Sequence, residues 1–191
     1  MPRHRKGVRA IGYHHGDLRR TVLAAAVDAI GESGLDSWSL RELARRAGVS
    51  HAAPAHHFGD KAGLLTALAA EGYALLADAL AAAGPDFLEA GLAYVRFAVA
   101  HPVHFGVMFQ PKIYRADDEA VQVARERAGR LLRQGAETVG STADGGATTA
   151  RAGWSIAHGF ASLWIAGAIP VPPGTDPLDA ARPVLARLLG R

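Results

Sequence analysis

The 191-residue sequence has no cysteine, only two methionines, and aromatic residues at just 7% of the chain. Without cysteine, a disulfide framework, a thiolate nucleophile and a cysteine-ligated zinc or iron–sulfur site are excluded. An excess of one charge is also lacking, because 21 Lys and Arg residues against 18 Asp and Glu residues leave a net charge of +3. A sum this small does not identify a partner, although the sequence pI of about 9.6 favours an anionic one.

Long apolar segments are scarce as well. The basic residues within 3–9 resemble the start of a signal peptide, but polar and charged residues follow where its apolar segment should lie. Residues 152–175 carry no Asp, Glu, Lys or Arg, yet only about 17 of them precede the prolines, against roughly 20 needed to span a membrane. We therefore expect a buried helix there, no membrane partner and a cytoplasmic protein.

Alanine, in contrast, is abundant, with 40 residues of the strongest helix former. Apolar residues recur at spacings of three and four, and neither strand alternation nor an internal repeat is present. The fold class we predict is all-α. Helices are expected over 17–30, 40–47, from a Ser50 cap onward, 60–80, 86–100, 103–109, 117–139, 150–168 and 176–189.

The positive charge is concentrated in the first third of the chain. Residues 1–63 hold ten Lys and Arg and six Asp and Glu, a net of +4, together with six of the nine histidines. Residues 64–191 hold 11 and 12, a net of −1. A solvated face or a basic tail explains such a skew as well as a nucleic-acid partner does.

A short helical pattern lies within this basic third. Ser39-Leu40-Arg41-Glu42 has the form of a capping box, in which Ser39 and Glu42 each satisfy a backbone donor of the other. The predicted helix ends at Gly48-Val49-Ser50, and a further helix follows. A glycine turn between two helices is typical of a helix-turn-helix, and an ordinary helical hairpin is the alternative.

At these residues the sequence resembles the TetR family of transcriptional regulators. The resemblance is carried by Ser39–Ala44, Gly48-Val49-Ser50, His57-Phe58-Gly59-Asp60-Lys61 and Leu64-Leu65. The opening segment 13–19, together with Trp154 and His158-Gly159, is similar to the branch of the family called WHG.

The resemblance implies an N-terminal three-helix helix-turn-helix DNA-binding domain followed by a helical-bundle effector and dimerisation domain. Residues 1–12 are then a flexible basic arm, 13–63 the DNA-binding domain, and 64–191 the ligand-binding and dimerisation domain. The arm, with basic residues from Arg3 to Arg9, either contacts DNA or is a solubilising tail.

The predicted DNA-binding residues are polar or small side chains around the glycine turn. They are Ser39, Arg41, Ser50, His51, Ala52, Ala53, His56, His57 and Lys61. Helix N-termini, hydroxyls and cations suit phosphates, and alanine methyls suit thymine. The chain departs from the family pattern at Pro54 and at Ala55, where many members have a tyrosine that contacts phosphate.

Two further sets of residues are predicted in the second domain, and for each the alternative is ordinary core. An apolar effector pocket is expected from Tyr94, Phe97, His101, Phe105, Met108, Phe109 and Phe160. A dimer interface formed by the last two helices, as in relatives of the family, is expected from Trp154, His158, Ala161, Trp164, Ile165, Val184, Leu185 and Leu188.

No cofactor and no metal are expected. Pro102 disturbs the spacing of His101 and His104, and neighbouring histidines such as His56-His57 diverge without a matching carboxylate. No paired-carboxylate motif, phosphate loop or nucleophile elbow indicates an enzyme. The function we predict is a homodimeric repressor released from a palindromic DNA operator by a small-molecule effector. The alternatives are a TetR-like activator and a helical small-molecule-binding protein or enzyme.

Overall fold

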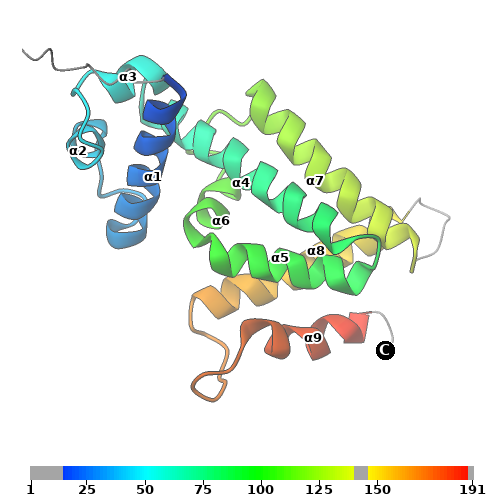
Figure 1. Cartoon of the computed structure of the whole chain (residues 1–191). Coiled ribbons are helices and arrows are strands. Elements are labelled where there is room, and N and C mark those ends of the chain that lie inside the picture. Colours follow the sequence, from blue (N-terminus) through cyan, green and yellow to red (C-terminus); the bar gives the residue numbers. More distant parts are fainter. Residues whose placement is uncertain (1–14, 140–145, 189–191) are drawn as a thin grey trace, which may run out of the picture. The chain divides into compact units, whose positions relative to one another are not determined.

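The computed structural model describes residues 15–139 and 146–188, and its regular structure within those ranges is entirely helical (Figure 1). The all-α prediction is therefore confirmed. The helices are α1 (His15–Ser33), α2 (Leu40–Arg46), α3 (Ala53–Phe58), α4 (Lys61–Ala83), α5 (Phe87–Ala100), α6 (Pro102–Met108), α7 (Glu119–Glu137), α8 (Ala147–Ile165) and α9 (Pro177–Leu188). The predicted arm, residues 1–12, lies outside the described residues.

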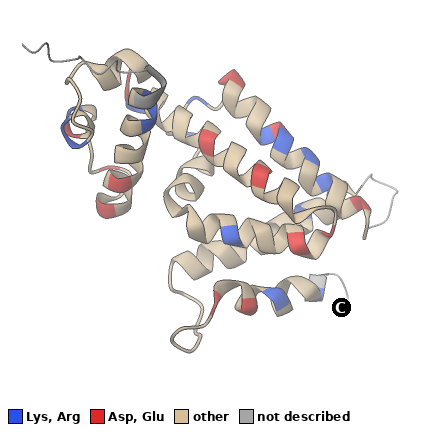
Figure 2. Ribbon diagram, viewed as in Figure 1, with Lys and Arg blue, Asp and Glu red and all other residues tan. Residues whose placement is uncertain are grey.

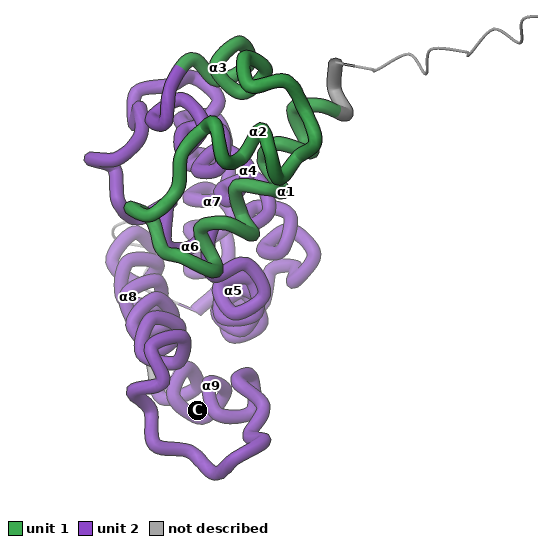
Figure 3. The backbone as a smooth tube through the Cα atoms, turned by 90° about the vertical axis from the view of Figure 1, so that its left-hand side faces the viewer, with its two compact units in different colours: residues 1–59 green, residues 60–191 purple. Residues whose placement is uncertain are grey.

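The chain divides into two compact units, residues 1–59 and residues 60–191 (Figure 3). In the first unit, α1 packs against both α2 and α3, which also contact each other. The side chains that hold this unit together are apolar and almost fully buried. They include Val22, Ala26, Ile30, Leu43, Ala44 and Phe58.

In the second unit, α4 packs against α5, α6 and α7, while α8 and α9 pack against α5 (Figure 1). By length and composition alone, α4 is apolar enough to cross a membrane, but 61% of its most apolar window is buried by the surrounding helices. Its apolar character is accounted for by its central place in this core.

The third helix begins later than the sequence prediction. Ser50 does not cap it; the helix starts at Ala53, and the Ser50 carbonyl accepts a turn hydrogen bond from the Ala53 N–H at 3.0 Å. A helix capped at Ser50 would need an N–H at Pro54 to bond that carbonyl, and proline has none. With the later start, Pro54 lies in the first turn, where its ring is tolerated and is fully buried.

A close contact between α4 and α6 depends on glycine. A Cβ placed on buried Gly72 would lie 2.5 Å from Met108 Sδ and 3.1 Å from His104 Cβ, whereas one placed on Gly106 would meet nothing within 4 Å. The two helices therefore approach each other at a distance that a side chain at residue 72 would prevent.

We predict that Gly72→Ala lowers the free energy of unfolding by about 1–3 kcal/mol, because the added methyl overpacks the contact. Gly106→Ala, also within a helix, should leave stability unchanged or raise it by up to about 1 kcal/mol, since alanine is the better helix former. Urea denaturation of the full chain measures both. Equal stability of the two variants would show that α4 and α6 have room for the methyl.

Candidate nucleic-acid interface and ligand cavity

The start of α2 is capped as expected in one half of the predicted box. Ser39 Oγ accepts a hydrogen bond from the Glu42 N–H at 3.2 Å, and the Ser39 side chain is otherwise exposed. The Glu42 carboxylate instead accepts a bond from Arg46 Nε at 2.9 Å. The charged guanidinium of Arg46 forms a stronger hydrogen bond than a backbone N–H would. The Glu42 carboxylate therefore stabilises α2 through its bond to the Arg46 side chain.

The arginines of α2 divide into two kinds. Arg46 joins α2 to α1, because its guanidinium lies 2.7 Å from the Glu32 carboxylate as well as 2.9 Å from that of Glu42. Arg41 and Arg45 are exposed and form no ion pair within the described part of the chain, so they carry the available positive charge of this helix (Figure 2). Arg45 was absent from the predicted set, although its spacing of four from Arg41 places it on the same helix face.

The turn between α2 and α3 requires glycine at residue 48. Gly48 has a φ of +66°, a conformation that side chains rarely adopt. Directly after it, the Val49 N–H donates to the Ala44 carbonyl at 3.0 Å. This hydrogen bond closes the end of α2 and lets the chain reverse into α3.

The structure brings the predicted residues of the turn and of α3 together on one segment. Four of them are exposed, namely Ser50, His51, Ala52 and His56. The other two, Ala53 and His57, are partly exposed. Phe58 is buried, and the Arg19 guanidinium of α1 lies 5.6 Å from the centre of its ring. Pro54 and Phe58 therefore anchor α3, while its exposed side presents imidazole and methyl groups.

Lys61, the remaining predicted DNA contact, belongs to the second unit. It is the first residue of α4, directly after Asp60, whose carboxylate accepts the Gly63 N–H at 2.8 Å. Lys61 is partly exposed. The histidines assemble no candidate metal centre, because no group of three or more His, Asp or Glu side chains suited to an ion occurs in the described residues.

The second unit contains a cavity of about 480 Å³ that is open to solvent. Its wall comes mainly from facing sides of α7 and α8, where small residues leave the space. The lining residues are Tyr73, Leu76, Tyr94, Phe109, Arg125, Ala128, Gly129, Leu132, Arg133, Ala147, Ala150, Arg151 and Trp154.

Of the predicted pocket residues, Tyr94 and Phe109 line this cavity. Four others, Phe97, Phe105, Met108 and Phe160, are buried in the core and are not among its lining residues, and neither is half-buried His101. The aromatic rings of this group pack on one another: Phe105 lies 5.3 Å from Phe109 and 6.2 Å from Tyr94 between ring centres. Large rings fill space, so small residues with helical spacing on α7 and α8 were the better signal for a cavity.

Tyr94 is the centre of a polar cluster beside the cavity. Its hydroxyl accepts the Trp154 Nε1–H at 3.1 Å and lies 2.9 Å from His158 Nδ1. Burial lowers the pKa of His158, which favours a neutral ring, and burial also raises the pKa of Tyr94. The His158 ring centre is 4.5 Å from that of Phe109.

The predicted interface residues fall into three groups. Trp154 and His158 belong to the polar cluster, and Ala161 and Leu185 are buried in the core of the chain at 0% and 4% exposure. Exposed or partly exposed apolar side chains remain on α8 and α9. They include Trp164, Ile165 and Val184, together with Leu163, which the sequence prediction omitted, and Trp154 itself is 40% exposed. The side chain of Leu188 lies outside the described residues.

Comparison with known families gives two matches along the chain. Residues 22–68 match the family described as bacterial regulatory proteins, tetR family, and residues 87–188 match the tetracyclin repressor-like C-terminal domain. A helix-turn-helix domain followed by such a helical domain defines a DNA-binding transcriptional regulator. The chain belongs to the TetR family of these regulators.

Individual proteins show how far the similarity extends. The HTH-type transcriptional regulator BetI of Klebsiella pneumoniae is 47% identical over 49 residues, so the match covers about a quarter of either protein. A structure from Rhodococcus sp. RHA1, described as a protein with unknown function, is 33% identical, has a TM-score of 0.76, and is matched over 95% of this chain and 100% of that one. LfrR of Mycobacterium smegmatis, solved in complex with proflavine, shares the fold at a TM-score of 0.62 and 20% identity, over 90% of this chain and 95% of that one.

We predict that Arg41→Gln and Arg45→Gln together weaken binding to duplex DNA and reduce the salt dependence of the affinity. Each lost phosphate contact lowers the slope of log K against log salt by about 1. Fluorescence anisotropy with labelled DNA at several salt concentrations measures both effects. The control, Arg127→Gln with Arg130→Gln, removes the same charge from α7, where these arginines pair with Asp78 and Glu126. An unchanged slope in the α2 variant would exclude both arginines as phosphate contacts.

We also predict that acid weakens the fold through His158. Its pKa in the folded state lies below the usual 6.5, so its contribution to stability is complete above pH 6.5 and is lost as the pH falls through the lowered value. The free energy of unfolding should therefore decrease between pH 7.5 and pH 5, as urea denaturation would show. His158→Asn, which keeps an acceptor and does not titrate, should lose part of this decrease, and exposed His51→Asn should not. The same pH dependence in both variants would contradict this role.

Proposed function

We propose that the protein is a homodimeric, cytoplasmic transcriptional repressor that leaves a palindromic operator when a small effector occupies the cavity. The observation that carries the proposal is the combination of an exposed recognition segment in one unit with a cavity of about 480 Å³ in the other. In this reading, residues 13–63 bind DNA, and residues 64–191 bind the effector and form the dimer.

The proposed DNA contacts combine phosphate binding and base reading. Exposed Ser39, Arg41 and Arg45 suit phosphates, because they offer a helix start and two guanidinium groups without ion-pair partners in the described chain. His51 and His56 present hydrogen-bonding imidazoles, and the methyl groups of α3 suit thymine. A dimer would place two such segments about 34–36 Å apart, one turn of DNA.

The proposed release acts through α4. Tyr73 and Leu76 of this helix line the cavity, and only Gly59 and Asp60 separate α4 from α3 along the chain. An effector that binds one position of α4 more tightly than another shifts the population towards it, in proportion to that difference in affinity. LfrR in complex with proflavine supports ligand binding by proteins of this fold.

The proposed interface uses the exposed apolar side chains of α8 and α9. Leu163, Ile165 and Val184 are 52%, 42% and 44% exposed, and such residues are typical of the centre of a homodimer contact. Membership of the WHG branch stays a prediction from the sequence, because the family that residues 87–188 match has a different description. We propose that the protein binds DNA and an effector without catalysing a reaction. Repression is proposed over activation on the resemblance to the family alone.

We predict that Val184→Glu converts the dimer to monomer, because a carboxylate at the centre of an apolar interface is buried without a partner. Val123→Glu, at a position of α7 that is 61% exposed, should leave the dimer intact. Sedimentation velocity distinguishes these species. A monomeric wild type, or a dimer that tolerates the Val184 change, would contradict the α8–α9 interface.

DNA binding itself is tested with the DNA upstream of the protein's own gene. At ~150 mM salt, which weakens non-specific phosphate contacts, the wild-type dimer should bind this DNA much more tightly than random DNA of equal length. Equal affinity for the two would contradict the proposal that the protein regulates from an adjacent operator.

A further inference from the structure

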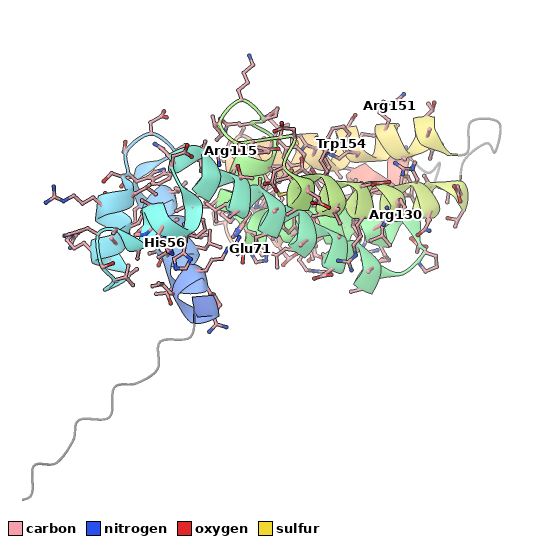
Figure 4. The ribbon with its side chains drawn as sticks, turned by 90° about the horizontal axis from the view of Figure 1, so that it is seen from above. His56, Glu71, Arg115, Arg130, Arg151 and Trp154 are labelled. Carbon is pink, nitrogen blue, oxygen red and sulfur yellow. The ribbon has the colours of Figure 1, made fainter. Side chains whose placement is uncertain are left out.

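The arginines around the cavity differ from the other arginines of α7. Arg127 and Arg130 are neutralised, the first by Asp78 at 2.7 Å and the second by Glu126 at 3.5 Å. Arg127 and Arg130 are not among the residues that line the cavity, whereas Arg125 and Arg133 line it. Arg151 of α8 joins them there, close to Trp154 (Figure 4).

These three arginines form no ion pair within the described ranges of the chain. The polar contact made by the guanidinium of Arg125 is with the neutral side-chain oxygen of Gln122 at 2.9 Å. The lining residues include no Asp and no Glu. The described wall of the cavity therefore carries three positive charges and no negative one.

The hydroxyl and indole groups of the wall already take part in hydrogen bonds within the protein. The Tyr73 hydroxyl donates to the Met108 carbonyl at 3.1 Å, and the Trp154 Nε1–H donates to the Tyr94 oxygen at 3.1 Å. The Tyr94 hydroxyl is within hydrogen-bond distance of His158, at 2.9 Å from Nδ1. Among the side chains of the wall, the guanidinium groups thus offer the available donors, and they bind carboxylate, sulfonate and phosphate oxygens in pairs of hydrogen bonds.

The rest of the wall is apolar. Leu76, Phe109, Leu132 and the Trp154 ring surround the space together with alanines and a glycine. A volume of about 480 Å³ lies within the range of pockets that hold small organic molecules, roughly 300–1,000 Å³. The apolar surface suits a hydrocarbon or aromatic body, since burying it is favourable.

We propose that the cavity binds a small organic anion, with its apolar body against Leu76, Phe109, Leu132 and Trp154 and its acidic group held by Arg125, Arg133 and Arg151. This assignment rests on the proposed function in one respect, because it names the chemical class of the effector. Cationic molecules of the same size are disfavoured by the three like charges. The competing explanation is that these arginines are only solvated surface charges at the edge of the cavity.

Two fluorescent probes with one scaffold test the proposal in the full-length protein. 1-Anilinonaphthalene-8-sulfonate carries a sulfonate, and N-phenyl-1-naphthylamine is the same framework without it. The sulfonate should bind at least ~10-fold more tightly, since hydrogen bonds to charged groups exceed neutral ones. Competition between the probes establishes that they share a site. Equal affinity for the two probes would overturn the proposal without any mutation.

Matched variants then assign the preference to residues. Arg133→Gln with Arg151→Gln should reduce sulfonate affinity about tenfold and change that of the neutral probe less than about twofold. Arg127→Gln with Arg130→Gln removes the same formal charge away from the cavity and should leave both affinities unchanged. An equal loss in the control would attribute the preference to net charge and overturn the cavity assignment.

Operator binding by the unliganded protein is measured in the same preparation. Specific DNA binding with no preference for the sulfonate refutes the anion class and leaves the proposed regulator standing. A sulfonate preference that depends on Arg133 and Arg151, without specific DNA binding, supports the anion site and refutes the regulator. The two ideas therefore fail by different observations.

Discussion

The burial of α4 is the constraint on which the second unit depends. This apolar helix packs against α5, α6 and α7, and the absence of a side chain at Gly72 sets its distance from α6. The start of α4 is capped by the Asp60 carboxylate, which accepts a hydrogen bond from the Gly63 N–H. The same carboxylate accepts two hydrogen bonds from Arg115 Nη2, at 3.0 and 2.8 Å. The Arg115 N–H also donates to Thr66 Oγ1 at 2.9 Å. The segment after α6 and the first turns of α4 are thus joined by hydrogen bonds.

Helix order and approximate bounds were predictable from the sequence, because apolar spacing records which face of each helix is buried. Caps were predictable where the chemistry was local: Ser39 caps α2, and Asp60 caps α4. The start of α3 was not, because the missing N–H of Pro54 outweighs the cap preference of Ser50. Which arginine of α2 is available also required the structure, since the partner of Arg46, Glu32, lies on another helix.

The cavity was less predictable than the helix-turn-helix. Aromatic residues of α5 and α6 looked suited to a pocket, but rings such as Phe105 fill the core by packing on one another. The space exists where Gly129 and alanines of α7 and α8 face each other, and its charge comes from arginines that form no ion pair in the described chain. That pairing depends on contacts between helices, which spacing along one helix does not reveal.

The central claim is that two copies of the exposed turn and α3 read DNA together. Selection of bound duplexes from a random library by the purified wild-type protein tests it most directly. We expect enrichment of a palindrome whose half-sites are centred about one helical turn, or a multiple of it, apart. Enrichment of a single asymmetric site, or of no sequence above the starting library, would contradict it.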